Sequence, residues 1–387
     1  MAPRSSRISA STLWAAICVL AVVAALVLWL APLSPAWVER EYSSSRYLTW
    51  QQFLTPLANL VPVALFDVLL AIVLLVLIVR WWRRYRAVRR VTGRWDSVGG
   101  WRKQLLLALL DLAGLAALVY LWFALSWGLN YERPSLATRL DFDRARVTRA
   151  SVLTMAQTTV AALNLLEPQA SQRPWPGYEA TRYTLSRSFD NVQRQLGQPA
   201  LAAPGRPKST LLNPYFRWAA IDGMTDPFFL ETLVSDDALP TERPFIIAHE
   251  WAHLAGYAQE SEANFLGWLT CLDASEQAQY SAWLALYWHV AAALPAADRR
   301  TLDASLHDGP KRDLRAIAAR YEQSAPRVRV FAWTLYDRFL KANRVSEGIA
   351  SYDAVVSLVV GTRFVRPWTP ALKIAIPPTA LTPREGS

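Results

Sequence analysis

Three long apolar stretches dominate the first third of the chain, and the pattern of apolar and polar positions changes after them. The stretches cover roughly residues 13–33, 60–79 and 105–129, about 20 residues each, which is the length that an α-helix needs to cross a bilayer. Beyond about residue 131, apolar positions recur at helical spacing among charged residues. The pattern therefore predicts three N-terminal membrane spans followed by a large domain outside the lipid.

The domain after the third span is expected to be mostly helical, with a small β element before residue 244. Its periodicity predicts helices over residues 150–166, 179–196, 277–293, 313–323, 329–342 and 351–360. The short runs RWAAID (217–222) and PFFLETLV (227–234) lie between turn signals and are typical of strands. The expected fold class is a mainly α membrane protein, divided into a membrane domain (1–131), an external domain (132–365) and a Pro-rich tail (366–387).

The net charge of +10 lies almost entirely in one loop. Nine Lys or Arg residues face one acid between residues 80 and 103, and Arg4 and Arg7 supply the remaining two positive charges. Short loops rich in Lys and Arg stay in the cytoplasm, so this loop and the N-terminus are predicted inside and the external domain outside. The rest of the chain is neutral overall, which argues against a nucleic-acid partner and leaves the lipid bilayer as the expected partner.

Two further features of the sequence limit the possible classes of protein. The chain has only two cysteines, Cys18 and Cys271, so no disulfide framework can stabilise the external domain. Asp67 and Asp111 interrupt the second and third spans. Because a charge in mid-span costs about 2.5 to 3.5 kcal/mol, both are expected to face other helices or protein-lined water. Two scattered acids make a poor pathway, which argues against a transporter or channel.

The candidate chemistry lies in HEWAHLAGYAQESEANF, where His249, Glu250 and His253 form the pattern H-E-x-x-H. Residues four apart lie on the same face of a helix, so both imidazoles can bind one cation at about 2.0 to 2.1 Å. Pro244 suits the first turn of such a helix, and Gly256 suits the left-handed residue just past its end. The segment therefore predicts a metal-binding helix between these two residues.

A catalytic zinc site needs a third protein ligand and one open position. The metzincin pattern would place a third histidine where this chain has Gln259, and a neutral amide is a poor zinc ligand. The gluzincin pattern takes a glutamate from a following helix, and both Glu260 and Glu262 are available.

The neighbours of the two glutamates on a helix over residues 260–272 differ. Glu260 shares its stripe with the smaller residues Asn264, Gly267 and Cys271, whereas Glu262 shares one with two leucines. A stripe of small residues lets two helices approach closely. This favours Glu260 as the third ligand and leaves Glu262 as the alternative.

The string E-S-E-A-N over 260–264 resembles the E-x-x-A-D or E-x-x-A-N element of gluzincin-type peptidases. In those peptidases the first Glu binds zinc and the last residue orients a ligand, which implies Glu260 as the ligand and Asn264 as its support.

A wider resemblance covers nearly the whole chain. The three spans, WGLNYERP, the histidine segment and YDRFLKANRVSEGIASYDAVVSLVV together resemble an uncharacterised bacterial membrane-protein family with a zinc-peptidase type of site. The resemblance implies a zincin-like, gluzincin-type external domain, one Zn²⁺ ion and a place in the bacterial cytoplasmic (inner) membrane.

The expected function is that of a membrane-anchored zinc metallopeptidase. His249, His253 and Glu260 would hold Zn²⁺, which lowers the pKa of a water molecule, and Glu250 would act as general base on that water. The run PFFLETLV is expected to be an edge strand that aligns a peptide substrate. A donor to the developing oxyanion is also required, for which the candidates are Tyr257, His289, His307 and Tyr352.

The alternative is a non-catalytic envelope protein, in which the metal only stabilises a domain that binds partner proteins. The two functions differ at Glu250, which hydrolysis requires and a structural metal site does not.

Overall fold

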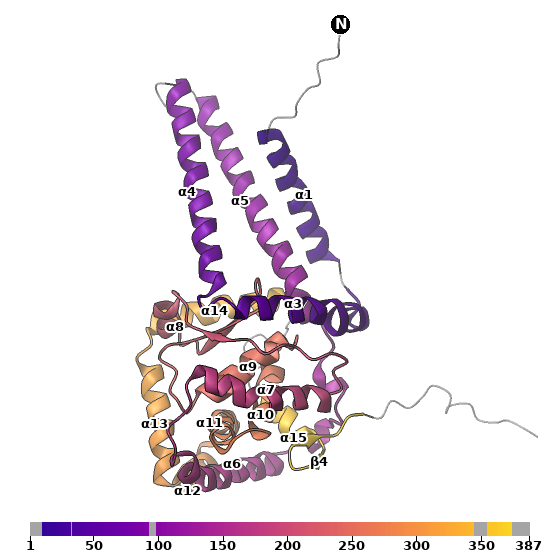
Figure 1. The fold of residues 1–387 in the computed structure, drawn as a ribbon, viewed down its shortest axis with the longest axis vertical. Helices are drawn as coiled ribbons and strands as arrows, with labels where there is room; N and C mark the ends of the chain where they lie inside the picture. The colour runs from indigo at the N-terminus through magenta and orange to yellow at the C-terminus, as the bar shows by residue number, and fades with distance from the viewer. Residues whose placement is uncertain (1–9, 32, 93–97, 344–353, 374–387) are drawn as a thin grey trace, which may run out of the picture.

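Three long helices rise from a mostly helical body (Figure 1) in the computed structural model, which describes residues 10–31, 33–92, 98–343 and 354–373. The three are α1 (Ala10–Leu30), α4 (Leu65–Thr92) and α5 (Val98–Ser126). Each contains a segment long and apolar enough to cross a membrane, namely Thr12–Leu30, Leu65–Arg83 and Leu105–Ser126. Most of their large apolar side chains are exposed, as lipid contact requires. The three apolar helices predicted from the sequence are confirmed, and the chain is membrane-associated.

The second span begins later than predicted, and the third ends earlier. Residues 60–64 form a turn that contains Pro62, so α4 begins only at Leu65. The third helix ends at Ser126, and the chain tightens into the short 3₁₀-helix η2 (Gly128–Glu132).

Both acids of the spans have protein partners, as expected. Asp111 on α5 accepts hydrogen bonds from Arg80 Nη2 on α4 at 2.7 Å and from Trp14 Nε1 on α1 at 2.9 Å. Asp67 in the first turn of α4 accepts from Thr210 Oγ1 at 2.7 Å and from the backbone N of Leu211 at 2.8 Å. Asp111 thus joins the three spans, whereas Asp67 joins a span to the body.

The connection between the first two spans folds onto the body. It comprises α2 (Pro35–Trp37), the π-helix η1 (Val38–Arg46) and α3 (Tyr47–Asn59), and α3 lies across the end of the body that faces the spans (Figure 1). Gln51 Nε2 donates to the carbonyl of Ala203 at 2.7 Å, and Thr55 Oγ1 donates to the carbonyl of Leu230 at 2.9 Å. These bonds tie α3 to the segments that precede the helix carrying His249 and His253.

The body confirms the mostly helical prediction. Its helices of seven residues or more are α6 (Arg149–Ala170), α7 (Tyr178–Gln195), α8 (Asn213–Ala219), α9 (Arg243–Leu254), α10 (Glu260–Leu272), α11 (Glu276–Ala292), α12 (Ala296–Ser305), α13 (Asp308–Glu322), α14 (Pro326–Ala342) and α15 (Ala354–Gly361). Two short 3₁₀-helices, η3 (Leu136–Thr138) and η4 (Arg144–Arg146), precede α6. Helices α9 and α10 form the centre of the core, where Trp251 and Trp268 are fully buried.

A small sheet lies beside α9. Its strands are β1 (Pro207–Lys208), β2 (Gly223–Asp226) and β3 (Glu231–Val234), in the order β1-β3-β2, with β1 parallel and β2 antiparallel to β3. The β element predicted before residue 244 is therefore present, but its strands differ from the predicted ones.

The predicted strand over 217–222 is wrong, since its first three residues belong to α8. Pro214 occupies the first turn of α8, and Ala220 ends the helix in the left-handed region at φ +57°. The run over 227–234 forms a strand only from Glu231. The Asp226 carboxylate accepts from the backbone N of Phe228 and of Phe229, both at 2.9 Å, and so holds a turn where the strand was expected to begin.

Part of the predicted tail packs on the body. Strands β4 (Phe364–Arg366) and β5 (Thr369–Pro370) form a hairpin, and Leu372 bridges to Leu140. The rest of the tail, residues 374–387, lies outside the described residues.

Candidate metal centre

Helices α9 and α10 place the candidate ligands, and both match their predicted extents. The chain reverses between them at Gly256, whose φ of +81° favours glycine. The helices cross closely at Gly267, where an added Cβ would lie 2.9 Å from the backbone N of His249. Only glycine leaves room for this contact. The small stripe of α10 therefore faces α9, as the sequence indicated.

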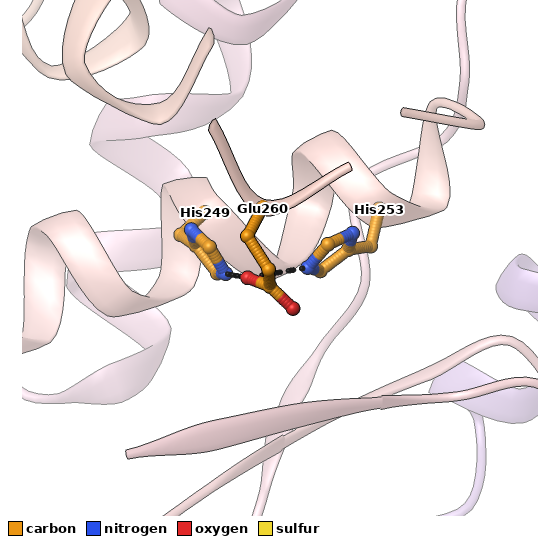
Figure 2. A group of neighbouring side chains, drawn as sticks. All are labelled: His249, His253 and Glu260. Atoms are coloured by element: carbon orange, nitrogen blue, oxygen red, sulfur yellow. Dashed lines mark ion pairs between the residues drawn. The ribbon is translucent and has the colours of Figure 1, made fainter. Parts of the chain in front are cut away.

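Three side chains from these helices converge on one point (Figure 2). Oε2 of Glu260 lies 3.2 Å from Nε2 of His249 and 3.6 Å from Nε2 of His253. One ligand atom from each residue lies within 4.8 Å of the other two. The two imidazole rings are perpendicular, with centroids 4.8 Å apart. This group could hold a metal ion.

Two of the three distances between the candidate ligand atoms suit a tetrahedral ion. Ligands at about 2.0 to 2.1 Å from a tetrahedral zinc ion lie about 3.4 Å apart. The two measured nitrogen–oxygen distances, 3.2 and 3.6 Å, lie on either side of this value. Nδ1 of His253 lies 2.7 Å from the carbonyl oxygen of Tyr257. A proton on Nδ1 donates to that carbonyl and leaves the lone pair of Nε2 for a metal.

Charges within the group stabilise each other. Burial would raise the pKa of the Glu260 carboxyl, but the two imidazoles and their hydrogen bonds hold that pKa well below its ordinary value. Burial would lower the pKa of His253, but Glu260 and Glu250 raise it to about 9. The pocket therefore attracts positive charge, as a cation site must. The hydroxyl of Tyr336 on α14 donates to Oε1 of Glu260, which leaves Oε2 facing the histidines.

Glu250 points from α9 toward strand β2. Its Oε2 accepts a hydrogen bond from Thr225 Oγ1 at 2.9 Å, and Thr225 also donates to its backbone carbonyl. A Cβ at Gly223 would lie 2.7 Å from its Oε1 and 3.0 Å from the carbonyl oxygen of Leu233, so this glycine lets β2 approach the carboxylate closely. Burial raises the pKa of the Glu250 carboxyl, although the nearby His249 and His253 oppose that shift. A buried carboxyl with a raised pKa suits proton transfer near neutral pH.

The structure separates the two candidate third ligands. Oε1 of Glu262 accepts from the backbone N of Leu136 at 2.6 Å, so this buried side chain supports the start of η3. The geometry thus brings Glu260, and not Glu262, to the histidines. Asn264 is buried one turn after Glu260, and its Nδ2 has no hydrogen-bond partner. No hydrogen bond between Asn264 and a ligand is found in the described part of the chain.

The three predicted oxyanion donors that lie in the described part of the chain do not gather at the site. The ring of Tyr257 lies under the Arg133 guanidinium, 4.6 Å from its centroid, and only its backbone carbonyl reaches His253. His289 is half-buried on α11 and His307 is exposed at the start of α13, and neither is in the metal-ligand group found among the described residues. Tyr352 lies outside the described residues.

Sequence reasoning missed several residues of the site. Tyr336 supports Glu260, Thr225 supports Glu250, and Nε1 of Trp127 donates to the carbonyl of His253 at 2.9 Å. Tyr131 is hydrogen-bonded to Tyr336, and burial raises its pKa. Trp127 and Tyr131 are conspicuous in WGLNYERP, but aromatic residues after a span suggest membrane anchors. Here both are buried beside the metal-ligand group instead.

Comparison with known proteins supplies the family. A family model described as "Protein of unknown function (DUF3810)" matches residues 42–360, from the π-helix after the first span to the end of α15. A search of curated proteins and a search of solved structures gave no match. The match includes two of the three apolar helices and the whole metal-ligand group, so the chain belongs to the DUF3810 family of proteins of unknown function.

Proposed function

We propose that this protein is a membrane-anchored zinc metallopeptidase with a gluzincin-type site. The observation that carries the proposal is the convergence of His249, His253 and Glu260 beside the buried carboxylate of Glu250. Two imidazoles and one carboxylate form the ligand set of many catalytic zinc sites. The basic loop over 80–103 supports an orientation with the N-terminus inside and the body outside a bacterial cytoplasmic membrane.

The residues of the site have distinct tasks. A zinc ion held by the three ligands would act as a Lewis acid toward a peptide carbonyl and would favour ionisation of water. Glu250 would take the proton of the attacking water and pass it to the leaving amine. Thr225 fixes the Glu250 carboxylate through its hydroxyl. Tyr336 fixes Glu260 in the same way, and it is the hydroxyl donor that the fold brings to the ligands.

Strand β2 is the natural guide for an extended peptide. Within the described residues it pairs only with β3, on one side, and it carries Thr225 and Gly223 against Glu250. A substrate segment that pairs with the free edge of β2 would present successive peptide bonds beside that carboxylate. The sequence had assigned this role to the run containing β3, which the structure places in the middle of the sheet.

One observation favours the alternative, a metal site that only stabilises an envelope protein. The ligands are enclosed, since His253 and Glu260 are 7% and 5% exposed and the His249 side chain is 14% exposed. A structural metal site is closed in this way, whereas a catalytic site keeps one position open.

Zinc analysis and hydrolysis of a quenched fluorescent peptide library by the full-length protein test the proposal. Glu250→Gln is expected to keep stoichiometric zinc and to abolish hydrolysis, because the amide cannot take the proton. Glu260→Ala is expected to lose zinc, with Glu262→Gln as the matched control that keeps it. Full zinc retention by Glu260→Ala would contradict the ligand assignment. Zinc retention by the wild type without hydrolysis of any peptide would favour the structural alternative.

A further inference from the structure

Two helices of the body expose apolar faces at the end where the spans enter. Helix α3 exposes Trp50, Phe53 and Leu57 at helical spacing, and α14 exposes Val330, Phe331 and Leu335. Phe53 is 59% exposed and Phe331 is 65% exposed. Both helices lie across the body below α1, α4 and α5 (Figure 1). These six residues, referred to below as the roof surface, come from segments about 280 positions apart in the chain.

The opposite faces of the same helices are the ones that pack. Gln51 and Thr55 of α3 bond to the body, while Ala332 and Leu340 of α14 are buried and Tyr336 donates to Glu260. On a helical wheel, Tyr336 lies opposite the exposed side chains of α14. The roof surface is therefore not needed for the core, and its exposure needs another explanation.

The charge of α14 indicates what covers it. The helix contains four basic residues and one acid, Asp337, which gives a net charge of +3. Arg327 and Arg338 are exposed among the apolar side chains. A helix with aromatic and aliphatic residues beside basic ones is typical of segments that lie in a membrane interface next to anionic lipids.

The roof surface is also continuous with the spans. Phe339 of α14 packs edge-on against Phe123 of α5, with ring centroids 5.7 Å apart. Leu60 and Val63, in the turn that leads from α3 into α4, are 77% and 56% exposed. Leu211, which bonds Asp67 in the first turn of α4, is also exposed. Exposed apolar side chains from three segments thus lie near the ends of the spans.

We propose that the roof surface lies in the headgroup and acyl boundary of the leaflet next to the body, so that α3 and α14 seat the body on the membrane. Helix α14 then has lipid on one face and Glu260 on the other. The metal-ligand group lies directly below this roof. Given the proposed peptidase function, on which this part rests, the substrates are polypeptide segments that emerge from the same leaflet.

Depth-dependent quenching tests the membrane contact. The full chain is reconstituted in vesicles of phosphatidylethanolamine and phosphatidylglycerol, with bimane attached to Phe331→Cys, Phe53→Cys or the control Arg300→Cys. Arg300 is exposed on α12, at the far end of the body (Figure 1). Cys18 and Cys271 are buried, and unmodified protein gives the labelling background.

Brominated acyl chains are expected to quench bimane at Phe331→Cys and Phe53→Cys several-fold more than at Arg300→Cys, and aqueous iodide is expected to do the reverse. Equal quenching at all three sites would overturn the proposal. Protection of Phe331→Cys from both quenchers would also overturn it, because a protein would then cover the roof surface.

A second measurement tests the substrate class alone. A quenched fluorescent peptide library is anchored to the same vesicles by a palmitoyl chain, through either no spacer or a long polyethylene glycol spacer. The two presentations concentrate the library equally at the surface, and the one without a spacer is expected to be hydrolysed several-fold faster. Equal rates would overturn the substrate class. If bimane is quenched as expected but neither library is hydrolysed, the proposed peptidase function is refuted. The membrane contact of the roof surface would still stand.

Discussion

Two buried groups of charged side chains in the body differ in whether the protein alone satisfies them. In the first, Lys208 Nζ donates to the carbonyls of Ala58 and Val63 at 2.7 and 3.2 Å and to the carboxylate of Glu231. Glu231 also accepts from the backbone N of Phe66 at 3.1 Å. An ammonium group has three donors, and all three have acceptors. The pair is complete, so it joins α3 and the start of α4 to the sheet without any ligand.

The second group is incomplete. In it, the buried carboxylates of Glu250 and Glu260 lie beside His249 and His253, and their negative charge raises the pKa of His253. Nδ1 of His249 and Nδ2 of Asn264 are buried without a hydrogen-bond partner. The two carboxylates thus draw a positive charge into the group, and a bound cation can supply that charge in place of a proton. The comparison therefore distinguishes a structural ion pair from a site that is suited to a metal.

The largest expected effect comes from breaking the complete pair. Lys208→Met leaves Glu231 buried without its cation, which is expected to lower the free energy of unfolding by about 3 to 5 kcal/mol. Denaturant unfolding of the purified protein in detergent micelles measures the change. The double variant Lys208→Met with Glu231→Gln is expected to recover much of the loss. A loss below about 1 kcal/mol in the single variant would show that the pair is not needed.

Zinc binding to the incomplete group is expected to change the free energy of unfolding somewhat less than the Lys208→Met substitution does. Free zinc at about 100 times its Kd should raise the free energy of unfolding by about 2.7 kcal/mol over the chelated protein. His249→Ala should show almost no zinc effect, whereas His307→Ala should behave as the wild type because this side chain is exposed and outside the group. Equal stabilisation of the wild type and His249→Ala would place the zinc elsewhere.

A smaller change, in zinc affinity, should follow from removing the hydrogen bond that supports Glu260. Tyr336→Phe removes the hydroxyl that donates to Glu260 and should weaken zinc binding about 10- to 100-fold, or about 1.4 to 2.7 kcal/mol. Competition with a zinc-binding dye measures the affinity. Tyr183→Phe is the control, since Tyr183 is 85% exposed. Unchanged affinity in Tyr336→Phe would mean that α14 covers the site without positioning its ligand.

The smallest change in the free energy of unfolding is expected from breaking an exposed ion pair. Arg206 Nε lies 2.5 Å from Glu179, but both side chains contact solvent. Arg206→Gln should cost about 0.2 to 1 kcal/mol, because water and salt screen the pair. If this variant lost as much stability as Lys208→Met in the same unfolding assay, burial would not explain the difference between the two pairs.

Local pattern was sufficient for the features that depend on neighbouring residues. The apolar length of the spans, the helix between Pro244 and Gly256 and the small stripe through Gly267 all follow from a few adjacent positions. Two of the strands did not follow. A seven-residue helix begins at Asn213, and a side-chain turn at Asp226 delays β3, so short-range hydrophobicity was misleading in both places.

The sequence by itself determined three apolar helices, a mostly helical body and the two histidines and glutamates that could bind a metal, because helix periodicity fixes which side chains share a face. The sequence favoured Glu260 over Glu262, but only the tertiary structure placed Glu260 against the histidines and Glu262 at η3, and only it brought Tyr336 and Thr225 to the site. The contacts of Thr225, Tyr336 and Glu262 join residues 25 to 126 positions apart. Such pairs depend on how whole elements pack, and no local pattern encodes that packing.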